Sequence, residues 1–594
     1  MGSDIRITAV RGHRPSPAAG ADAEGSDGGQ RPGEIPLPPP EAHVHLLGSR
    51  AASVDRGRRR LAFVTLVMAF AFGVIGVRLV DLMVFGRGGD GAASYYAAPV
   101  LEARADLADR HGDLLATDLD SFALYIRRVD VRSVPETVAT LKGVFPSLDP
   151  DRLAKRLENR RGQVHVMWDV SPAQKKRLLE TGLPGLEFQR DVKRIYPNGD
   201  LAAHAIGYVN RAHDGILGAE RAFEREIRRA APDGTPVRLS LSRSVQHHLE
   251  HELDAAMDEF SAIGAMGVVL DVYSGEILAL ASLPAFNANM PLNADDSRQL
   301  NKVTNGVYEL GSVFKLITVA AGLELGAIGL DTVVDATKPY RVGRFHIRDF
   351  FGEERPLTVA EVVRYSSNIG AAKIAHLMDP DAYFDALRRF GLTDPSPVEV
   401  IEVAAPILPA QWEVTEQATV SFGYGLSVSP LQLASAVAAI ANGGYLVAPT
   451  LRALPKGAPV KAVRVISERS AQDVLGLMRL VVEEGTGRRA DVEGFPVAGK
   501  TGTAEKSVVG GYGDSDRISS FVGVFPAQAP QFLVYVVLDE PKPTKNTAGR
   551  ATGGWTAAPT AGNIIRKIAP VLKVRPTRPA SVQPVAYTPQ SQEP

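Results

Sequence analysis

The chain of 594 residues contains no cysteine, and this absence excludes three kinds of chemistry at once. Without thiols there is no disulfide, no structural thiolate metal site and no thiol nucleophile, and such a composition suits a compartment in which free thiols would be oxidised. The chain also lacks an excess of charge of either sign, because 66 basic and 67 acidic residues leave a net charge of −1. This balance argues against nucleic acid as a bulk partner.

The usual metal and phosphate motifs are absent too. His247 and His251 have the i, i+4 spacing of two metal ligands on a helix, but the sequence lacks the His-Glu-x-x-His pattern and an evident third ligand. We expect these histidines on an exposed helix face. The glycine-rich segments 442–444 and 485–487 lack the Gly-Lys-Ser/Thr ending of a phosphate loop, so we interpret each as a turn. The sequence therefore predicts no metal and no other cofactor.

One apolar run is long enough to be considered as a membrane span. Residues 61–77 are apolar and uncharged, and the run continues to Phe85, which predicts a transmembrane signal anchor over 61–85. Arginines at positions 56 and 58–60 precede it, so the N-terminus is expected in the cytoplasm and the rest of the chain in the periplasm. The alternatives are a buried helix of a soluble domain and a cleaved signal peptide. The segment before the run is far longer than the start of an ordinary signal peptide.

Composition and pattern divide the rest of the chain. Residues 1–60 are rich in Pro, Gly and Ala, and residues 574–594 in Pro, Gln and Ser, so we expect two disordered tails, the first of them cytoplasmic. Residues 86–235 alternate strand-like runs with charged helical patterns and are interpreted as an elongated, non-catalytic pedestal. In residues 236–573 a hairpin pattern comes first, helices follow and strands return. Strands from both ends around a helical middle predict an α+β domain with one antiparallel sheet.

Three short motifs carry the chemistry: Ser312-Val313-Phe314-Lys315, Ser366-Ser367-Asn368 and Lys500-Thr501-Gly502-Thr503. The first is expected about once by chance, and the second is more often a turn or a helix cap than part of a site. The third is rarer. Their occurrence together, in this order, predicts a serine acyl-transfer site.

Each motif supplies a group that acyl transfer needs. A helix places Lys315 one turn after Ser312, so Ser312 is the expected nucleophile and Lys315 its base. To act as a base near pH 7, Lys315 must have a pKa well below the ~10.4 of a free lysine. Burial and a second cation, Lys500, would both lower that pKa. Ser366 and Asn368 are expected to relay a proton and to bind the substrate amide.

The third motif is expected to line the cleft as a strand. Lys500 is also a candidate to hold a substrate carboxylate, and Thr501, Gly502 and Thr503 are the expected substrate-binding residues. Gly502 would keep the strand edge clear of side chain. The backbone N–H groups of Ser312 and Thr503 are the expected oxyanion hole.

At these motifs the chain resembles the penicillin-recognising serine acyltransferases, and more closely the class B penicillin-binding proteins. The resemblance runs from about residue 95 to residue 570. Further similar segments lie outside the motifs: Arg104–Gly112 with Leu115-Ala116, Arg194–Pro197 with Gly207, Gly218–Glu220, Gly267–Pro284 and Thr552–Pro559. One departure is Leu310, where the commoner residue of the family is proline. Leucine here is usual in the division enzymes of alphaproteobacteria, and the departure does not touch the catalytic positions.

The resemblance implies a β-lactamase-like sheet with helices on both faces, joined to the pedestal. It implies a peptidoglycan D,D-transpeptidase that cross-links stem peptides of the septal wall through a Ser312 acyl-enzyme, releases D-alanine and is inhibited by β-lactams. The implied location is the inner membrane at the division septum. The implied partners are a SEDS-family glycan polymerase, FtsW, and other divisome proteins, since the region before residue 236 is too short to hold a glycosyltransferase as well as the pedestal.

Other interpretations stay open at this point. The elongation-specific class B transpeptidase is one. A β-lactamase is another, and it would need a water-activating base, for which Glu399 and Glu402 are candidates. A β-lactam sensor would need a cytoplasmic signalling domain, which the composition of residues 1–60 does not support. In the pedestal, Arg104, Asp109 and Arg110 form either a charge network that ties it to the next domain or a partner-binding face, and the structural role is favoured.

Overall fold

The structure is a computed structural model that describes residues 62–77, 103–160, 162–290, 292–293, 295–508 and 511–576. The chain forms two units, residues 1–97 and 98–594, which are described separately. In the first unit, residues 62–77 form a helix. No helix within the described ranges has both the length and the apolar character required to cross a bilayer. The rest of the predicted anchor over 61–85 lies outside the described residues, as do residues 1–60 and 577–594 of the predicted tails.

The N-terminal part of the second unit is built on one long strand. Its elements are β1 (Leu107–Ala108), β2 (Leu114–Arg127), α2 (Val134–Val144), α3 (Pro150–Asn159), β3 (Gln163–Val170), α4 (Pro172–Glu180), β4 (Leu186–Ile195), α5 (Ala203–Ile206), α6 (Gly218–Ala222), α7 (Glu224–Ala230) and β5 (Val237–Arg238). β2 pairs antiparallel with β1, β3 and β4, and β1 pairs in parallel with β5. Ser133, Asp149 and Ser171 cap α2, α3 and α4 with a side-chain oxygen, and a proline stands in the first turn of each helix.

The C-terminal part contains a five-stranded sheet in the order β14-β15-β16-β6-β7. Its elements are α8 (Arg243–Phe260), β6 (Gly264–Asp271), β7 (Ile277–Leu283), α9 (Lys315–Glu324), β8 (Val333–Asp335), β9 (Tyr340–Val342), β10 (Phe345–Ile347), β11 (Pro356–Thr358), α10 (Val359–Tyr365), α11 (Asn368–Ala375), α12 (Pro380–Arg389), α13 (Val414–Val420), α14 (Pro430–Ala441), β12 (Tyr445–Val447), β13 (Ala462–Arg464), α15 (Glu468–Glu484), β14 (Ala498–Val508), β15 (Gly511–Phe525), β16 (Phe532–Asp539) and α16 (Ala557–Val571). All four strand pairs of the sheet are antiparallel.

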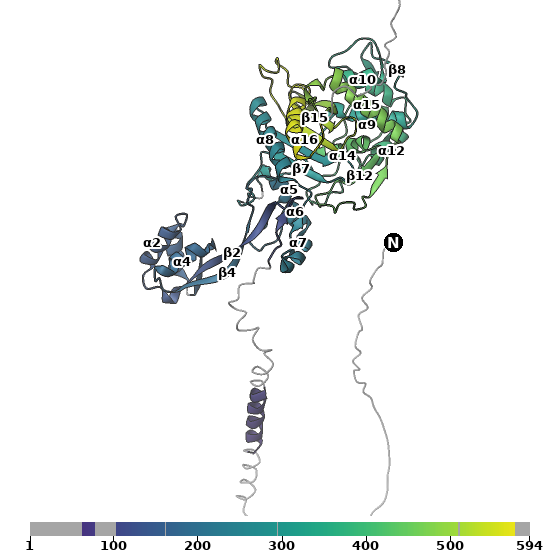
Figure 1. Ribbon diagram of the computed structural model, residues 1–594. Helices are drawn as coiled ribbons and strands as arrows, with labels where there is room; N and C mark the ends of the chain where they lie inside the picture. The colour runs from purple at the N-terminus through teal and green to yellow at the C-terminus, as the bar shows by residue number, and fades with distance from the viewer. Residues whose placement is uncertain are drawn as a thin grey trace, which may run out of the picture. The chain divides into compact units, whose positions relative to one another are not determined.

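Helices cover both faces of this sheet because its strands are apolar on both sides. In β16, Leu533 and Tyr535 belong to one core, while Val534 and Val536 belong to the other, as the two-residue period of a strand requires. α8 and α16 contact each other and fill the core on one face (Figure 1). α9, α10, α14 and α15 contribute to the core on the other face. The prediction of an α+β domain with one antiparallel sheet and helices on both faces is confirmed.

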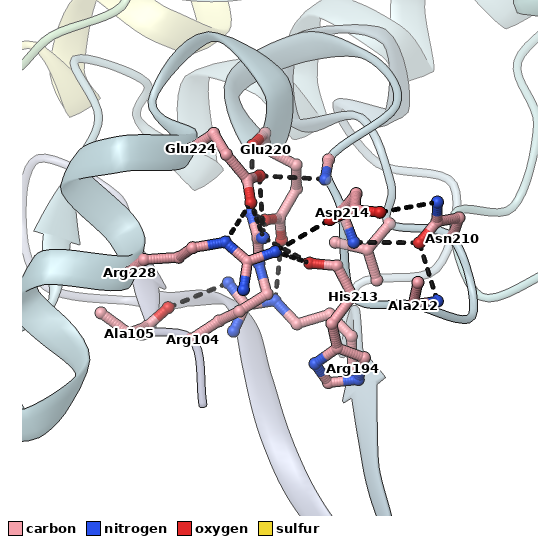
Figure 2. A network of polar contacts seen from close by, with 12 residues as sticks. Arg104, Ala105, Arg194, Asn210, Ala212, His213, Asp214, Glu220, Glu224 and Arg228 are labelled. Atoms are coloured by element: carbon pink, nitrogen blue, oxygen red, sulfur yellow. Dashed lines mark hydrogen bonds and ion pairs between the residues drawn. The ribbon is translucent and has the colours of Figure 1, made fainter. Parts of the chain in front are cut away.

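Arg104 lies at the centre of a buried charge network. Its Nη2 lies 2.6 Å from Glu220 Oε2, and its Nη1 lies 2.8 Å from Glu224 Oε2. Arg194 joins the same network, with its Nε 2.7 Å from Glu220 Oε1 and its Nη1 3.0 Å from Asp118 Oδ1. Figure 2 shows the two glutamates converging on these arginines. Because the Arg104 and Glu220 side chains are fully buried, each charge depends on its partners in the network for compensation, which is a structural role.

Asp109 and Arg110 connect the same region to the C-terminal part of the chain. Asp109 Oδ2 accepts a hydrogen bond of 3.0 Å from the N–H of Arg243, at the start of α8. Arg110 Nη2 lies 3.5 Å from Glu276 Oε2, in the turn between β6 and β7. The structural interpretation of these residues, a charge network between the two parts, is therefore confirmed.

Candidate active site

The candidate nucleophile lies where a short 3₁₀ helix, Gly311–Phe314, runs into α9. Lys315 is the first residue of α9, and its Nζ lies 2.7 Å from Ser312 Oγ. Gly311 has φ +59°, and a Cβ there would lie 2.6 Å from the Thr503 carbonyl oxygen. Glycine thus lets the 3₁₀ helix approach β14 closely enough to bring Ser312 beside the third motif.

The second motif lies at the junction of α10 and α11. Ser366 ends α10 in the left-handed conformation, with φ +63°, and Ser367 caps α11 by accepting a 2.9 Å hydrogen bond from the Gly370 N–H. This sharp turn directs two side chains of the motif at Lys315. Its Nζ lies 3.3 Å from Ser366 Oγ, 3.0 Å from the Ser366 carbonyl oxygen and 2.7 Å from Asn368 Oδ1.

The third motif lies on β14, an edge strand of the sheet. Lys500 pairs with Val522 of β15, and its Nζ lies 2.9 Å from Ser366 Oγ and 3.1 Å from the Thr501 carbonyl oxygen. Ser366 Oγ is therefore shared by the nitrogens of two lysines. The structure thus brings together Ser312, Lys315, Ser366, Asn368 and Lys500, the five side chains predicted for the reaction.

The electrostatic state of this cluster follows from burial. Lys315 and Lys500 are both 0% exposed. Burial lowers the pKa of Lys500 from its ordinary value to about 7. Burial, and then the neighbouring charge of Lys500, hold the pKa of Lys315 well below its ordinary value, with Asp349 acting in the opposite direction. Lys315 is therefore suited to be a neutral amine.

A cleft of about 390 Å³ opens above the cluster. Its lining includes five of the predicted site residues: Ser312, Ser366, Asn368, Thr501 and Thr503. Gly502 is not part of the lining, and a Cβ there would lie 2.3 Å from Ser520 Oγ and 2.8 Å from the Leu310 carbonyl oxygen. Gly502 thus allows β14 to pack closely against the 3₁₀ helix. The sequence suggested a different reason for this glycine, namely a strand edge kept clear of side chain.

Asp349 is a site residue that sequence analysis missed. Its Oδ2 accepts a 2.7 Å hydrogen bond from Ser367 Oγ, and its Oδ1 accepts hydrogen bonds from the N–H groups of Asn368, at 2.5 Å, and Ile369, at 2.9 Å. These contacts hold the start of α11, from which Asn368 faces Lys315. Asp349 follows β10 in a loop, so no local motif identifies it.

The rim of the cleft is aromatic and basic. It includes Phe350, Phe351, Tyr424, Trp555, Arg488, Arg489, Arg517 and Arg550. Thr486 belongs to the rim as well, because its Oγ1 lies 2.6 Å from Thr501 Oγ1. Residues 485–487 form a turn, as predicted, but sequence analysis did not place this turn at the site.

Neither glutamate considered for a β-lactamase lies in the cleft lining. Glu399 Oε2 accepts a 2.9 Å hydrogen bond from the Leu451 N–H, and its Oε1 accepts one from Thr450. Glu402 Oε1 accepts a 3.1 Å hydrogen bond from the Gly218 N–H. Both glutamates therefore make structural contacts away from the cleft lining. Outside the site, His247 and His251 lie on the exposed face of α8.

Two family descriptions match this chain. Residues 99–239 match the "Penicillin-binding Protein dimerisation domain", and residues 265–566 match the "Penicillin binding protein transpeptidase domain". The second match covers the strands of the sheet, all three motifs and the helices from α9 to most of α16, but not α8. The predicted boundary at residue 235 remains a prediction.

Individual proteins agree with these family matches. The chain is 39% identical to a probable peptidoglycan D,D-transpeptidase FtsI of Caulobacter vibrioides, over 92% of this chain and 94% of that protein. It is 29% identical to the peptidoglycan D,D-transpeptidase FtsI of Escherichia coli K12, over 86% and 91%. A crystal structure of penicillin-binding protein 3 from Mycobacterium tuberculosis with aztreonam matches with a TM-score of 0.63 and 26% identity, over 82% of this chain and 99% of that one. The chain therefore belongs to the class B penicillin-binding proteins.

Proposed function

We propose that this protein is a peptidoglycan D,D-transpeptidase that cross-links stem peptides of the septal wall and is acylated by β-lactams. The observation that carries the proposal is the fully buried Lys315, whose Nζ lies 2.7 Å from Ser312 Oγ. The relatives named as D,D-transpeptidases and the aztreonam complex of a similar protein support it.

The contacts of Lys315 fit a neutral amine. Its two N–H groups donate to the Ser366 carbonyl oxygen and to Asn368 Oδ1, which leaves the lone pair to accept the Ser312 hydroxyl proton. Ser312 Oγ then attacks the carbonyl carbon of the penultimate D-alanine. We assign the oxyanion hole to the backbone N–H groups of Ser312 and Thr503, which the close approach at Gly311 brings near each other.

Ser366 is placed to return the proton. The amide C–N bond breaks as the proton on Lys315 passes through Ser366 Oγ to the departing amine of the terminal D-alanine. When Lys500 is protonated, it donates to Ser366 Oγ and keeps that oxygen oriented. An acceptor amine then attacks the ester carbonyl and gives its proton back along the same groups. Ser312 is regenerated and the two peptides are joined. Asn368, Thr501, Gly502 and Thr503 are assigned to holding the donor peptide along β14.

Acylation by penicillin tests this assignment. Full-length protein incubated with benzylpenicillin should give an adduct on the peptide that contains Ser312, detected by mass spectrometry, because a β-lactam leaves a slowly hydrolysed ester on the nucleophile. Lys315→Ala should nearly abolish the adduct, whereas Lys373→Ala, a lysine on α11 outside the cleft lining, should not. An adduct that forms at the same rate in Lys315→Ala and in the unmodified protein would refute the role of the base.

We further propose that the protein is anchored in the inner membrane by residues 61–85, with its catalytic part in the periplasm. The expected partners are FtsW, a SEDS-family glycan polymerase, and other divisome proteins. Depletion should give long cells without septa. Round, widened cells that still divide would show that the protein is instead an elongation enzyme.

A further inference from the structure

Two arginines flank one tryptophan at the rim of the cleft. The guanidinium carbon of Arg489 lies 3.4 Å from the centroid of the Trp555 ring, and that of Arg550 lies 5.2 Å from it. Both arginines are exposed and line the cleft. Within the part of the chain that the structure describes, neither forms an ion pair with a carboxylate. The ring orients two guanidinium groups whose N–H edges have no anionic acceptor among the described residues.

The charges around this arrangement favour an anion from outside. Two cations beside the same ring repel each other, and a carboxylate between or beside them relieves that repulsion. Glu505 is the one carboxylate among the described residues of the lining, and it lies beyond Thr503 at the far end of the motif. As far as the described lining extends, the end of the cleft at Thr501 therefore has positive charge without a counterion.

The pair lies at the Thr501 end of β14. Arg489 lies in the 3₁₀ helix Arg488–Ala490, three residues after Thr486, and Thr486 Oγ1 contacts Thr501 Oγ1 at 2.6 Å. Gly554, next to Trp555, is packed so closely that a Cβ there would lie 2.5 Å from the Thr486 carbonyl oxygen and 3.9 Å from Thr501 Cγ2. The sheet edge, Thr486 and the flanked tryptophan thus form one contiguous wall.

The direction of a bound peptide follows from the sheet. β14 has a free edge, and a peptide that adds to it in antiparallel orientation runs from the Thr503 end toward the Thr501 end. With its reacting carbonyl at Ser312 and Thr503, its last residue and terminal carboxylate reach the Thr501 end. Lys500 is poorly placed to meet that group, because its side chain is fully buried and its Nζ is bonded to Ser366 and to the Thr501 carbonyl.

We infer that Arg489 and Arg550, oriented by Trp555, bind the terminal carboxylate of the donor peptide and the equivalent carboxylate of a β-lactam. This inference rests on the proposed transpeptidase function, because it takes the acyl carbonyl to lie at Ser312. Sequence analysis suggested Lys500 as the residue that holds the substrate carboxylate. The inference assigns this role to the two arginines instead.

A matched pair of inhibitors isolates the carboxylate. Benzylpenicillin and its methyl ester carry the same β-lactam, but only the acid carries the negative charge. The second-order rate constant of Ser312 acylation is measured for both by mass spectrometry with full-length protein. In the double variant Arg489→Ala/Arg550→Ala, the rate with the acid should fall by about tenfold to a hundredfold, because charge-assisted hydrogen bonds are lost. The rate with the ester should stay within about twofold, which also shows that the variant is folded.

Conservative and control variants complete the test. Arg489→Lys/Arg550→Lys keeps the charge but loses the planar fork and should recover part of the preference for the acid. Arg388→Ala, an arginine of α12 outside the cleft, should change neither rate. An equal loss with acid and ester, or no loss with the acid, would overturn the inference. Failure of benzylpenicillin itself to acylate Ser312 in the unmodified protein would instead refute the proposed function.

Discussion

Replacing Lys500 by methionine should move the acidic limb of the pH profile of acylation to higher pH. Methionine keeps the approximate length of the side chain but removes its charge. Burial, the larger cause of the lowered Lys315 pKa, remains in the variant, while the second cause, the charge of Lys500, is lost. Lys315 then holds its proton more tightly, and a protonated Lys315 cannot act as the base.

The size of the effect follows from the geometry. The Nζ atoms of Lys315 and Lys500 both contact Ser366 Oγ, at 3.3 and 2.9 Å, so they lie within roughly 6 Å of each other. Two unit charges at about 6 Å with an effective dielectric constant of about 20 repel by about 3 kcal/mol. This corresponds to a displacement of the limb by about two pH units. Because the pKa of Lys500 is about 7, its charge is present throughout the acidic range of the profile.

The assay is the rate of benzylpenicillin acylation of full-length protein at a series of pH values. The position of the limb is the readout, since loss of the hydrogen bond to Ser366 also lowers the plateau rate in Lys500→Met. Lys500→Arg keeps the charge, so it should leave the limb in place and retain a detectable rate. A limb that does not move in Lys500→Met would refute the electrostatic coupling of the two lysines.

Ser312→Ala should abolish the penicillin adduct seen by mass spectrometry, and an adduct that survives would exclude this serine as the nucleophile. Arg104→Ala should lower the free energy of unfolding, measured by urea denaturation, by about 3–5 kcal/mol because it removes one of the two arginines that pair with the buried Glu220 carboxylate, and also a partner of Glu224. The Arg110 side chain is 28% exposed, so Arg110→Ala should lower the free energy of unfolding by only about 1 kcal/mol or less. Equal losses of stability in the Arg104 and Arg110 variants would contradict this reasoning. A reporter active only outside the cytoplasm should be active when fused after Phe85, with the protein retained whole in membranes; release of a shortened soluble form would favour a cleaved signal peptide.

The parts of the site that sequence analysis predicted best are those governed by local geometry. Ser312 and Lys315 meet because residues three apart lie on one face of a helix, whatever the rest of the fold does. The continuous apolar run of β16 similarly predicts a strand that is covered on both faces. The α+β architecture followed from where strand patterns and helix patterns occur along the chain.

Contacts between residues far apart in the sequence could not be predicted from local patterns. Asp349 caps α11 from a separate loop, and no property of a single aspartate distinguishes it from a surface residue. The sequence likewise indicated either a structural or a partner-binding role for Arg104, and only its full burial against Glu220 decided for the structural role. Burial depends on what packs around a residue, which a linear pattern does not contain.

The sequence by itself determined the identity of the reacting groups, their order along the chain and the type of fold that holds them. Tertiary structure alone decided that one hydroxyl, Ser366 Oγ, lies between two buried lysines, and that Arg489 and Arg550 meet at Trp555. The physical reason is that helix turns and strand alternation are set by neighbouring residues, whereas desolvation and charge coupling depend on distances between segments that are far apart in the chain and come together only through packing.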